Sequence, residues 1–235
     1  MLDPWINNRC WSNYQLIKGR IRAVTLIFNG LGGAVVNTWT PLELALAEEN
    51  ILTILPYYGP WSWMNRSSRA FVDDLVERVY SVLQLGDDVP LIASGVSMGG
   101  CASLLYSRYG KRPVAGCDAL YPVTDLIYHF DERHDVAVSM SRAFYGYAEP
   151  WEEVLREHSP LYQVEHMPRI PYLIIHGLND KCVNIYHSDA MAEAMRKRSL
   201  QLEYIRDPQL GHGCNIPLRV WQKRIEFILS LLQKQ

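Results

Sequence analysis

Hydrophobic residues follow two alternating patterns along most of the chain. Short, nearly continuous apolar runs predict buried strands at residues 23–28, 51–56, 90–93, 114–121, 172–176 and 200–205. Between them, apolar residues recur every three or four positions and predict helices at residues 41–50, 67–85, 99–109, 184–198 and 217–232. Strands that are buried on both faces read as continuous apolar runs. The alternation therefore predicts an α/β fold, with a mostly parallel, doubly wound sheet and helices on both of its faces.

The alternation stops between residues 123 and 169. Two helical stretches, at residues 135–144 and 151–157, stand where a single crossover helix would be enough. We expect one domain over residues 1–235, with a lid or cap inserted at about 123–169 that shapes a substrate pocket. A long crossover with no role in binding is the alternative.

The sequence Gly95-Val96-Ser97-Met98-Gly99 follows the third predicted strand and precedes a helix. This is the pattern of a nucleophile elbow, in which a sharp strand-to-helix turn exposes a serine hydroxyl. Glycines suit the flanking positions, because the turn brings backbones together or requires a positive φ. The free N–H groups at the start of the helix favour developing negative charge. Ser97 is therefore a candidate nucleophile, although small-residue turns also occur without any chemistry.

Two later loops supply a candidate acid and a candidate base. Asp180 follows the fifth predicted strand, and His212 stands between glycines after the sixth. The order Ser97, Asp180, His212, with each residue just after a strand, is the order found in α/β hydrolases. We expect a catalytic triad in which His212 takes the proton of Ser97 and Asp180 orients the imidazole.

Three other ionisable residues compete for these roles. Asp125 follows the fourth predicted strand and is a rival acid, whose other role would be a helix cap or a turn former. Asp207 lies too close in sequence to His212 to be preferred. His176, at the end of a strand, is expected to be a hydrogen-bonded structural histidine.

From Ala23 to nearly its end, the chain resembles an α/β-hydrolase-fold serine hydrolase. Similarity to the prolyl-oligopeptidase-like and dienelactone-hydrolase-like branches rests on Ser159-Pro160-Leu161, on the run from Ile170 to Gly177 with Asp180, and on the elbow extended to Gly100. Unlike the large peptidases of that branch, this protein is expected to have no N-terminal propeller domain. About twenty residues precede the first predicted strand, enough for one short hairpin, so the early antiparallel strands are expected to be missing.

An oxyanion hole is expected beside the serine. One donor should be the backbone N–H of Met98, directly after the nucleophile. The resemblance aligns residues 29–33, Asn-Gly-Leu-Gly-Gly, with the family's His-Gly-x-Gly-Gly loop and implies the Leu31 N–H as the second donor. Asn29 stands where the family usually has histidine. Because both donors are backbone groups, we expect activity to survive this difference.

Composition narrows the function further. The net charge of −2 gives no sign of a nucleic-acid surface, and no apolar stretch approaches the roughly 20 residues that cross a bilayer. The N-terminus lacks the features of a secretory signal, so we expect a cytoplasmic protein, although a mature secreted chain would look the same. Neither a metal nor another cofactor is expected. Five cysteines cannot all pair and are expected to be reduced; a Cys182–Cys214 pair is left open.

The loop after the second predicted strand is rich in aromatic residues: Tyr57, Tyr58, Trp61 and Trp63. We predict that they form a wall of the substrate pocket, faced by aromatic residues of the insertion; the alternative is that some of them pack beneath it. No cluster of basic residues offers a site for a carboxylate or a phosphate. The sequence therefore predicts a carboxylesterase that acts on a small uncharged ester.

Other functions and partners stay open at this point. A small peptidase or amidase, or an acyl transferase, would use the same triad, and a non-catalytic ligand-binding protein could keep the fold. No nucleic-acid or membrane partner is expected. A homodimer would cover the sheet edge that the missing strands leave exposed.

Overall fold

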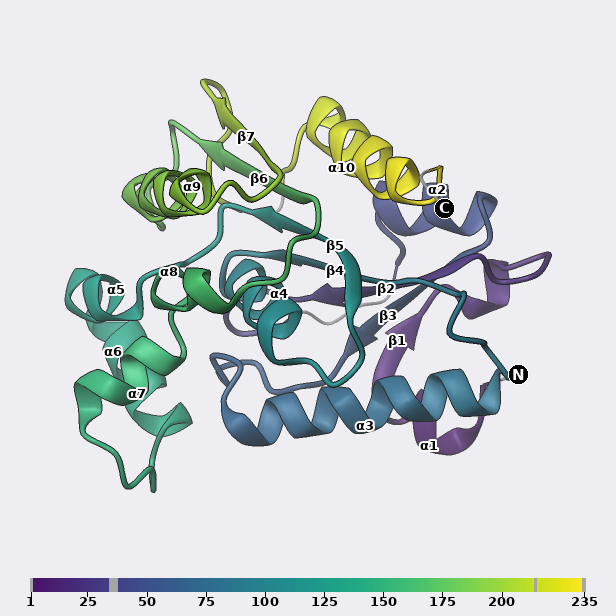
Figure 1. Ribbon diagram of the computed structural model, residues 1–235, viewed down its shortest axis with the longest axis horizontal. Helices are drawn as coiled ribbons and strands as arrows, with labels where there is room; N and C mark the ends of the chain where they lie inside the picture. The colour runs from purple at the N-terminus through teal and green to yellow at the C-terminus, as the bar shows by residue number, and fades with distance from the viewer. Residues whose placement is uncertain (1, 34–37, 214, 234–235) are drawn as a thin grey trace.

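The protein is built on a seven-stranded sheet whose strands are ordered β1-β3-β2-β4-β5-β6-β7 (Figure 1). The computed structural model describes residues 2–33, 38–213 and 215–233. Six strands are parallel: β2 (Ala23–Phe28), β3 (Ile51–Pro56), β4 (Leu91–Val96), β5 (Val114–Leu120), β6 (Tyr172–Gly177) and β7 (Leu202–Asp207). The short strand β1 (Cys10–Ser12) pairs antiparallel with β3. The predicted fold class is confirmed.

Helices cover both faces of the sheet. One face packs against α2 (Pro41–Glu48) and α10 (Leu218–Leu231), and the other against α3 (Arg66–Val82), α4 (Met98–Tyr109) and α9 (Tyr186–Lys197). Successive strand residues point to opposite faces. Along β4, Leu91 and Ala93 therefore join the core under α3 and α4, while Ile92 joins the core under α2 and α10. A short helix, α1 (Pro4–Asn7), and a 3-10 turn, η1 (Tyr14–Leu16), precede β2.

The insertion lies between β5 and β6, beside the carboxyl ends of the central strands (Figure 1). It contains α5 (Leu126–Glu132), α6 (His134–Ala143), α7 (Trp151–Glu157), α8 (Pro160–Gln163) and the 3-10 turn η2 (Val164–His166). The helices predicted at residues 135–144 and 151–157 correspond to α6 and α7. The sequence pattern did not reveal α5 and α8.

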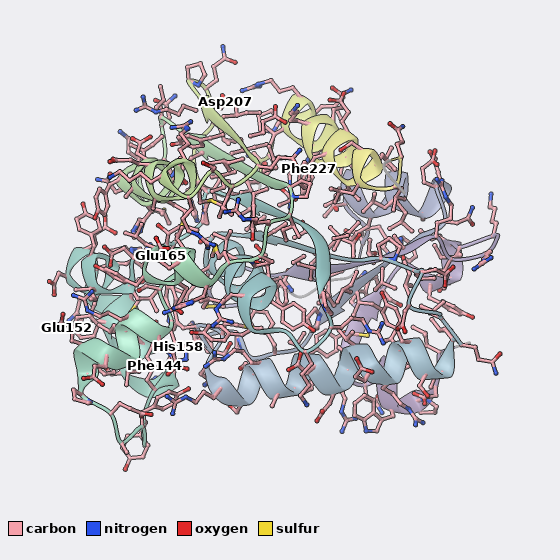
Figure 2. All side chains as sticks on the ribbon, viewed as in Figure 1. Phe144, Glu152, His158, Glu165, Asp207 and Phe227 are labelled. Atoms are coloured by element: carbon pink, nitrogen blue, oxygen red, sulfur yellow. The ribbon has the colours of Figure 1, made fainter. Side chains whose placement is uncertain are left out.

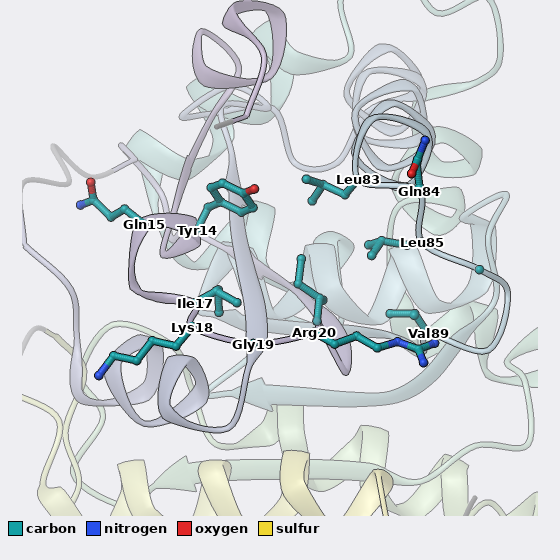
Figure 3. A pocket seen from close by; sticks show the side chains of 12 residues that line it. Tyr14, Gln15, Ile17, Lys18, Gly19, Arg20, Leu83, Gln84, Leu85 and Val89 are labelled. Carbon is teal, nitrogen blue, oxygen red and sulfur yellow. The ribbon is translucent and has the colours of Figure 1, made fainter.

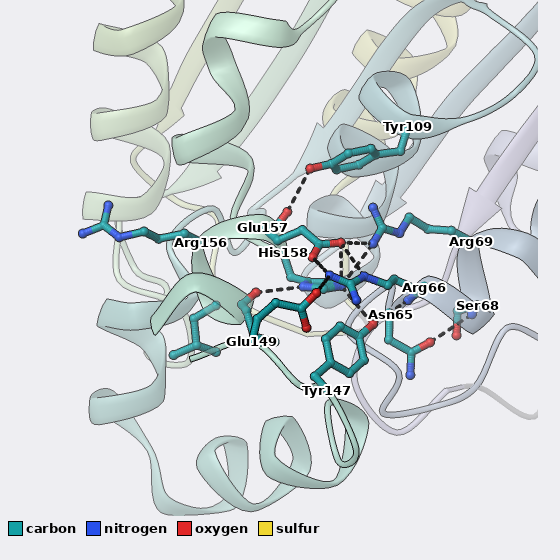
Figure 4. Close-up of polar contacts among 12 residues, drawn as sticks. Asn65, Arg66, Ser68, Arg69, Tyr109, Tyr147, Glu149, Arg156, Glu157 and His158 are labelled. Atoms are coloured by element: carbon teal, nitrogen blue, oxygen red, sulfur yellow. Dashed lines mark hydrogen bonds and ion pairs between the residues drawn. The ribbon is translucent and has the colours of Figure 1, made fainter. Parts of the chain in front are cut away.

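Ion pairs join this insertion to the start of α3 (Figure 4). Arg66 Nη2 lies 2.7 Å from Glu149 Oε1 and also pairs with Glu157, which in turn pairs with Arg69. His158 is fully buried beside them, and its ring lies 4.4 Å from that of Phe144 (Figure 2). The insertion is therefore fastened to the sheet layer by charged side chains as well as by apolar packing.

A buried ion pair ties α10 to the sheet. Arg224 Nε donates to Asp118 Oδ2 on β5 at 2.8 Å, and Arg224 Nη2 donates to Ser94 Oγ on β4 at the same distance. The side chains of Arg224 and Asp118 are 1% and 0% exposed. Asp118 Oδ1 has no hydrogen-bond partner among the described residues. Because water reaches neither the guanidinium nor the carboxylate, each charge is stabilised mainly by the other.

Among the described residues, no helix is long and apolar enough to cross a membrane.

Candidate active site

Ser97 stands on a sharp turn between β4 and α4. Its backbone has φ 58° and ψ −122°, in the left-handed half of conformational space that non-glycine residues rarely adopt. The turn leaves no room for side chains at the flanking glycines. A Cβ on Gly95 would lie 2.0 Å from the Gly99 carbonyl oxygen, and one on Gly99 would lie 2.0 Å from the Phe28 oxygen. The glycines of the motif are therefore required by close backbone approach.

The structure brings Ser97, His212 and Asp180 together at the carboxyl ends of three parallel strands. His212 Nε2 lies 3.0 Å from Ser97 Oγ, and His212 Nδ1 lies 2.7 Å from Asp180 Oδ2. A carboxylate can only accept, so Nδ1 carries the imidazole proton and Nε2 is left to accept from the serine hydroxyl. The Asp180 side chain is 1% exposed and that of His212 is 17% exposed. This arrangement can deprotonate a serine.

The carboxylate of Asp180 is surrounded by donors. Its Oδ1 accepts the backbone N–H groups of Cys182 and Val183 at 2.8 and 2.9 Å, and its Oδ2 faces both His212 and His176. Burial acts to raise the pKa of the Asp180 carboxyl, but the two imidazoles and the two N–H groups outweigh it. The pKa is held well below its usual range, so Asp180 is charged at neutral pH.

Tyr121 also contributes to the site, although the sequence analysis did not select it as a candidate. Its ring packs on the His212 ring with 4.4 Å between centroids, and its hydroxyl donates to the Gly213 carbonyl at 3.2 Å. Tyr121 has φ 36° and directly follows β5. It therefore supports both the ring and the backbone of the His212 loop. A tyrosine just after a strand, at the sheet edge that holds the site, was the one available signal.

The loop at residues 29–33 lies directly beside the serine. A Cβ on Gly30 would lie 3.4 Å from Ser97 Cβ. The N–H groups of Leu31 and Met98 donate to no described residue. Tyr58 Oη donates to the Asn29 carbonyl at 2.8 Å and holds the start of the loop. Two free N–H groups next to the serine are what an oxyanion hole needs.

The aromatic loop divides into exposed and buried residues. Tyr57, which is 52% exposed, and Tyr58 line a cleft of about 310 Å³ together with the loop at residues 29–33. Trp61, which is 54% exposed, lines a second hollow of about 420 Å³ against α6. Trp63 is 1% exposed and donates from Nε1 to Ser139 Oγ at 2.9 Å. It packs beneath the insertion, the alternative that the sequence left open, and not on a pocket wall.

The expected facing wall is also partly buried. Phe144 packs against the rings of Tyr147, Trp151 and His158 inside the insertion, and Tyr145 points into solvent at 90% exposure. Phe144 therefore belongs to the core of the insertion, together with buried aliphatic side chains such as Val136, Met140, Val154 and Leu155.

A larger hollow, of about 530 Å³, is lined by none of Ser97, Asp180 and His212 (Figure 3). It is lined by residues 14–21, which precede β2, and by residues 83–89, which precede β4. It therefore lies at the amino ends of the strands, whereas Ser97 follows the carboxyl end of β4. Size alone would point to the wrong edge of the sheet.

The rival acids have structural partners. Asp125 caps α5 by accepting the N–H groups of Ile127 and Tyr128. Asp207 accepts from two backbone N–H groups in its own turn and pairs with Arg219 at 2.8 Å. Neither carboxylate contacts His212, so Asp180 is the acid of this arrangement.

One cluster in the described chain has the composition of a metal site. Donor atoms of His129, Glu132 and His187 lie within 4.8 Å of one another. However, His187 Nδ1 accepts the backbone N–H groups of Thr124 and Asp125, each at 3.2 Å. Its Nε2 must then carry the proton and donate to Glu132, which leaves no lone pair for an ion. The cluster fits a hydrogen-bond network that joins α5 to α9, not a metal site.

The four described cysteines are all free thiols. Cys10, Cys101 and Cys117 are buried and free, and Cys182 is exposed and free. Cys214, the second member of the pair left open by the sequence, lies outside the described residues.

Comparison with known proteins gives a consistent picture. The profile of the prolyl oligopeptidase family matches residues 65–235. The uncharacterized peptidase YtmA of Bacillus subtilis (strain 168) is 24% identical over 160 residues, which cover 66% of this chain and 62% of YtmA. The chain therefore spans less than two thirds of that relative.

Solved structures share the fold. An acylaminoacyl peptidase of Pyrococcus horikoshii aligns with a TM-score of 0.72 and 15% identity, over 90% of this chain and 38% of that one. A truncated carbohydrate esterase from gut microbiota gives the same TM-score and identity, over 92% of this chain and 88% of that one. At such identities the likeness shows the α/β-hydrolase fold alone.

Proposed function

The chain belongs to the prolyl oligopeptidase family, a family of serine hydrolases, and we propose that it cleaves a small, uncharged carboxylic ester. In this proposal Ser97 is the nucleophile, His212 the general base and Asp180 the residue that orients the imidazole. The observation that carries it is the unbroken contact from Ser97 Oγ to His212 Nε2 and from His212 Nδ1 to Asp180 Oδ2, at 3.0 and 2.7 Å.

The first half of the reaction forms an acyl-enzyme. Ser97 Oγ attacks the acyl carbonyl while its proton moves to His212 Nε2, and Asp180 stabilises the imidazolium. The negative charge that develops on the carbonyl oxygen is received by the N–H groups of Met98 and Leu31. Each such donor is typically worth about 3 kcal/mol in the transition state. When the tetrahedral intermediate collapses, the C–O bond to the alcohol breaks and His212 returns the proton to the alcohol.

The second half of the reaction releases the acid. Water attacks the acyl carbon, His212 takes its proton, and the second tetrahedral intermediate expels Ser97, which recovers the proton from His212. The products are a carboxylic acid and an alcohol, and the enzyme returns to its starting protonation state.

The cleft beside the oxyanion loop supports an uncharged acyl group. The described residues that line it are glycines, prolines, tyrosines and Asn29, and none carries a charge. A buried ionic group there would meet no counter-ion, so a short neutral acyl chain fits best. Trp61 lies next in sequence to Pro60 of this cleft, and we propose that its exposed ring contacts the alcohol group of larger esters.

Hydrolysis of p-nitrophenyl acetate tests the proposal. We expect the wild-type protein to hydrolyse it, Ser97→Ala to lose nearly all of that activity, and a fluorophosphonate probe to label only the wild type. If Ser97→Ala hydrolyses the ester at the wild-type rate, the assignment is wrong. A wild type that is folded but neither hydrolyses the ester nor reacts with the probe would instead favour a non-catalytic binding protein.

A small peptidase is the second candidate function. Its support is the family itself, together with the peptidase names of YtmA and the Pyrococcus horikoshii protein. The triad is the same, but an amine leaving group must be protonated before it departs. Paired ester and anilide substrates with one acyl group decide between the two. A kcat/KM for the anilide equal to or above that for the ester would favour the peptidase.

An acyl transferase is tested in the same assay by adding an alcohol. Faster transfer to the alcohol than to water would favour it.

The sheet edge also supports the proposal of a homodimer. Strand β1 is the outermost strand on this side, and among the described residues no further strand pairs with its outer edge. The part of β3 beyond β1 is already bonded, because the Asn13 side chain accepts from the Thr53 N–H and donates to the Ile51 carbonyl. The molecular mass in solution checks this, and a monomer at micromolar concentration would contradict it.

A further inference from the structure

A second histidine, His176, lies behind the proposed triad. It is the penultimate residue of β6 and is fully buried. Its Nε2 lies 3.1 Å from the Val183 carbonyl oxygen, and its Nδ1 lies 2.7 Å from Ser188 Oγ on α9. A carbonyl oxygen can only accept, so Nε2 carries the proton, and Nδ1 accepts from the Ser188 hydroxyl. The two partners therefore fix the orientation of the His176 ring and keep a proton on Nε2.

In this orientation the Nε2–H of His176 points toward the loop that carries Asp180. Val183, which accepts from His176 through its carbonyl, donates its own N–H to Asp180 Oδ1 at 2.9 Å. His176 Nε2 also lies 3.6 Å from Asp180 Oδ2, the oxygen that accepts from His212. The His176 N–H thus holds the backbone of the acid loop and places the positive end of its dipole near the carboxylate.

We propose that His176 is a positioning residue for ester hydrolysis, which acts through Asp180 and never contacts the substrate. Its N–H fixes the Asp180 loop, and the dipole of this N–H offsets part of the carboxylate charge that His212 experiences. The inference rests on the proposed function, because it assigns His176 a role only if Ser97, His212 and Asp180 act as a triad. A histidine that only fills space in the core would affect stability and nothing else.

Few side chains other than His176 are placed to act on the Asp180 carboxylate. Among the described residues, the ionisable side chains that face Asp180 are His176 and His212. Tyr121 packs on the His212 ring. Cys182, in the same loop, donates its backbone N–H to Asp180 Oδ1. Loss of the His176 N–H would therefore leave Asp180 Oδ2 facing His212 alone.

Two amide substitutions of His176 distinguish a positioning role from a purely structural role in the core. In His176→Gln the amide N–H can take the place of Nε2–H, whereas in His176→Asn the shorter amide reaches only the place of Nδ1. We expect His176→Asn to lower kcat/KM for p-nitrophenyl acetate about 10- to 100-fold, the range that a misplaced catalytic group can cost. We expect His176→Gln to recover most of the loss.

The pH profile supplies the second readout. In His176→Asn the acid limb of kcat/KM should move to higher pH, because the uncompensated Asp180 carboxylate stabilises the His212 imidazolium more strongly. The matched control is His158→Asn, which alters another fully buried histidine, in the insertion. We expect this control to keep the wild-type acid limb at a temperature where all variants are folded.

The outcomes are distinguishable. A folded His176→Asn with wild-type kcat/KM and an unmoved acid limb overturns the inference, and so does equal loss in the Asn and Gln variants. If His176→Asn does not fold, Ser188→Ala replaces it, since losing this hydroxyl removes the hydrogen bond that holds the His176 ring at Nδ1. Wild-type kcat/KM in that variant also overturns the inference. Activity that survives Ser97→Ala would contradict the proposed function instead.

Discussion

Acid should weaken the attachment of the insertion through His158. This side chain is fully buried, its Nδ1 lies 2.8 Å from the Val154 carbonyl, and its Nε2 lies 3.4 Å from both Arg69 Nη2 and Tyr147 Oη. Burial lowers the pKa of His158 from its ordinary value of 6.5 to about 4, and the nearby arginines act in the same direction. The ring is therefore neutral in the folded protein at pH 7.

The sign of the effect follows from proton counting. Between pH 6.5 and 4 the unfolded chain binds a proton at His158 that the folded protein does not bind. The contribution to stability is thus complete above pH 6.5 and is lost as the pH falls toward 4. A shift of about 2.5 pH units corresponds to about 3 kcal/mol of unfolding free energy over this window. That is a large part of the stability of an ordinary domain.

Urea unfolding at pH 7.0, 5.5 and 4.5 measures this contribution. His158→Asn keeps an N–H near the Val154 carbonyl but cannot titrate. We expect the unfolding free energy of the wild type to fall by about 2–3 kcal/mol more than that of the variant between pH 7.0 and 4.5. Glu157, whose pKa is lowered to about 2 because its arginine partners outweigh burial, loses its stabilising effect only below about pH 4.5. Equal slopes for the two proteins would refute the reasoning.

Three further substitutions test other parts of the structure. Arg224→Met should lower the unfolding free energy by about 3–5 kcal/mol, because Asp118 stays buried without its partner, and adding Asp118→Leu should restore most of it in urea unfolding. Tyr121→Ala should lower kcat for p-nitrophenyl acetate with little change in KM, since the His212 ring loses its support; an unchanged kcat would contradict this. Trp61→Ala should raise KM about tenfold for esters of bulky apolar alcohols but leave p-nitrophenyl acetate unaffected, and equal effects on both substrates would exclude a subsite there.

The parallel strands were predictable because each depends on a local pattern. Strands β2 and β3 have the predicted bounds, since a strand covered on both faces must be apolar throughout its length. Strand β1 was not predicted as such, because three residues at a sheet edge carry no period of their own. Helix α8 has four residues, about one turn, so no helical period can repeat within it.

The proximity of Ser97, Asp180 and His212 was predictable for a related reason. Parallel strands end at one edge of the sheet, so a residue just after each of three strands arrives near the other two. Ser97, Asp180 and His212 each need only a local placement. The positions of Tyr121 and Trp63 could not be predicted in this way, because they depend on contacts with distant segments. Trp63 bonds Ser139, 76 residues away, and Tyr121 bonds Gly213, 92 residues away.

The contrast between local placement and long-range contacts also explains why the substrate is harder to deduce from the sequence than the catalytic residues are. The cleft of about 310 Å³ lies between two loops that follow different strands, at residues 29–33 and 57–60. Its width is set by bonds between those loops, from Gly32 N–H to the Pro60 carbonyl at 2.7 Å and from Tyr58 Oη to the Asn29 carbonyl at 2.8 Å. No residue pattern in either loop encodes these contacts. Because the Tyr58 hydroxyl is occupied in holding the loop at residues 29–33, Tyr58 shapes the cleft through its backbone and ring. In the proposed function we therefore expect Tyr57 and the glycine turn opposite it to contact the acyl group.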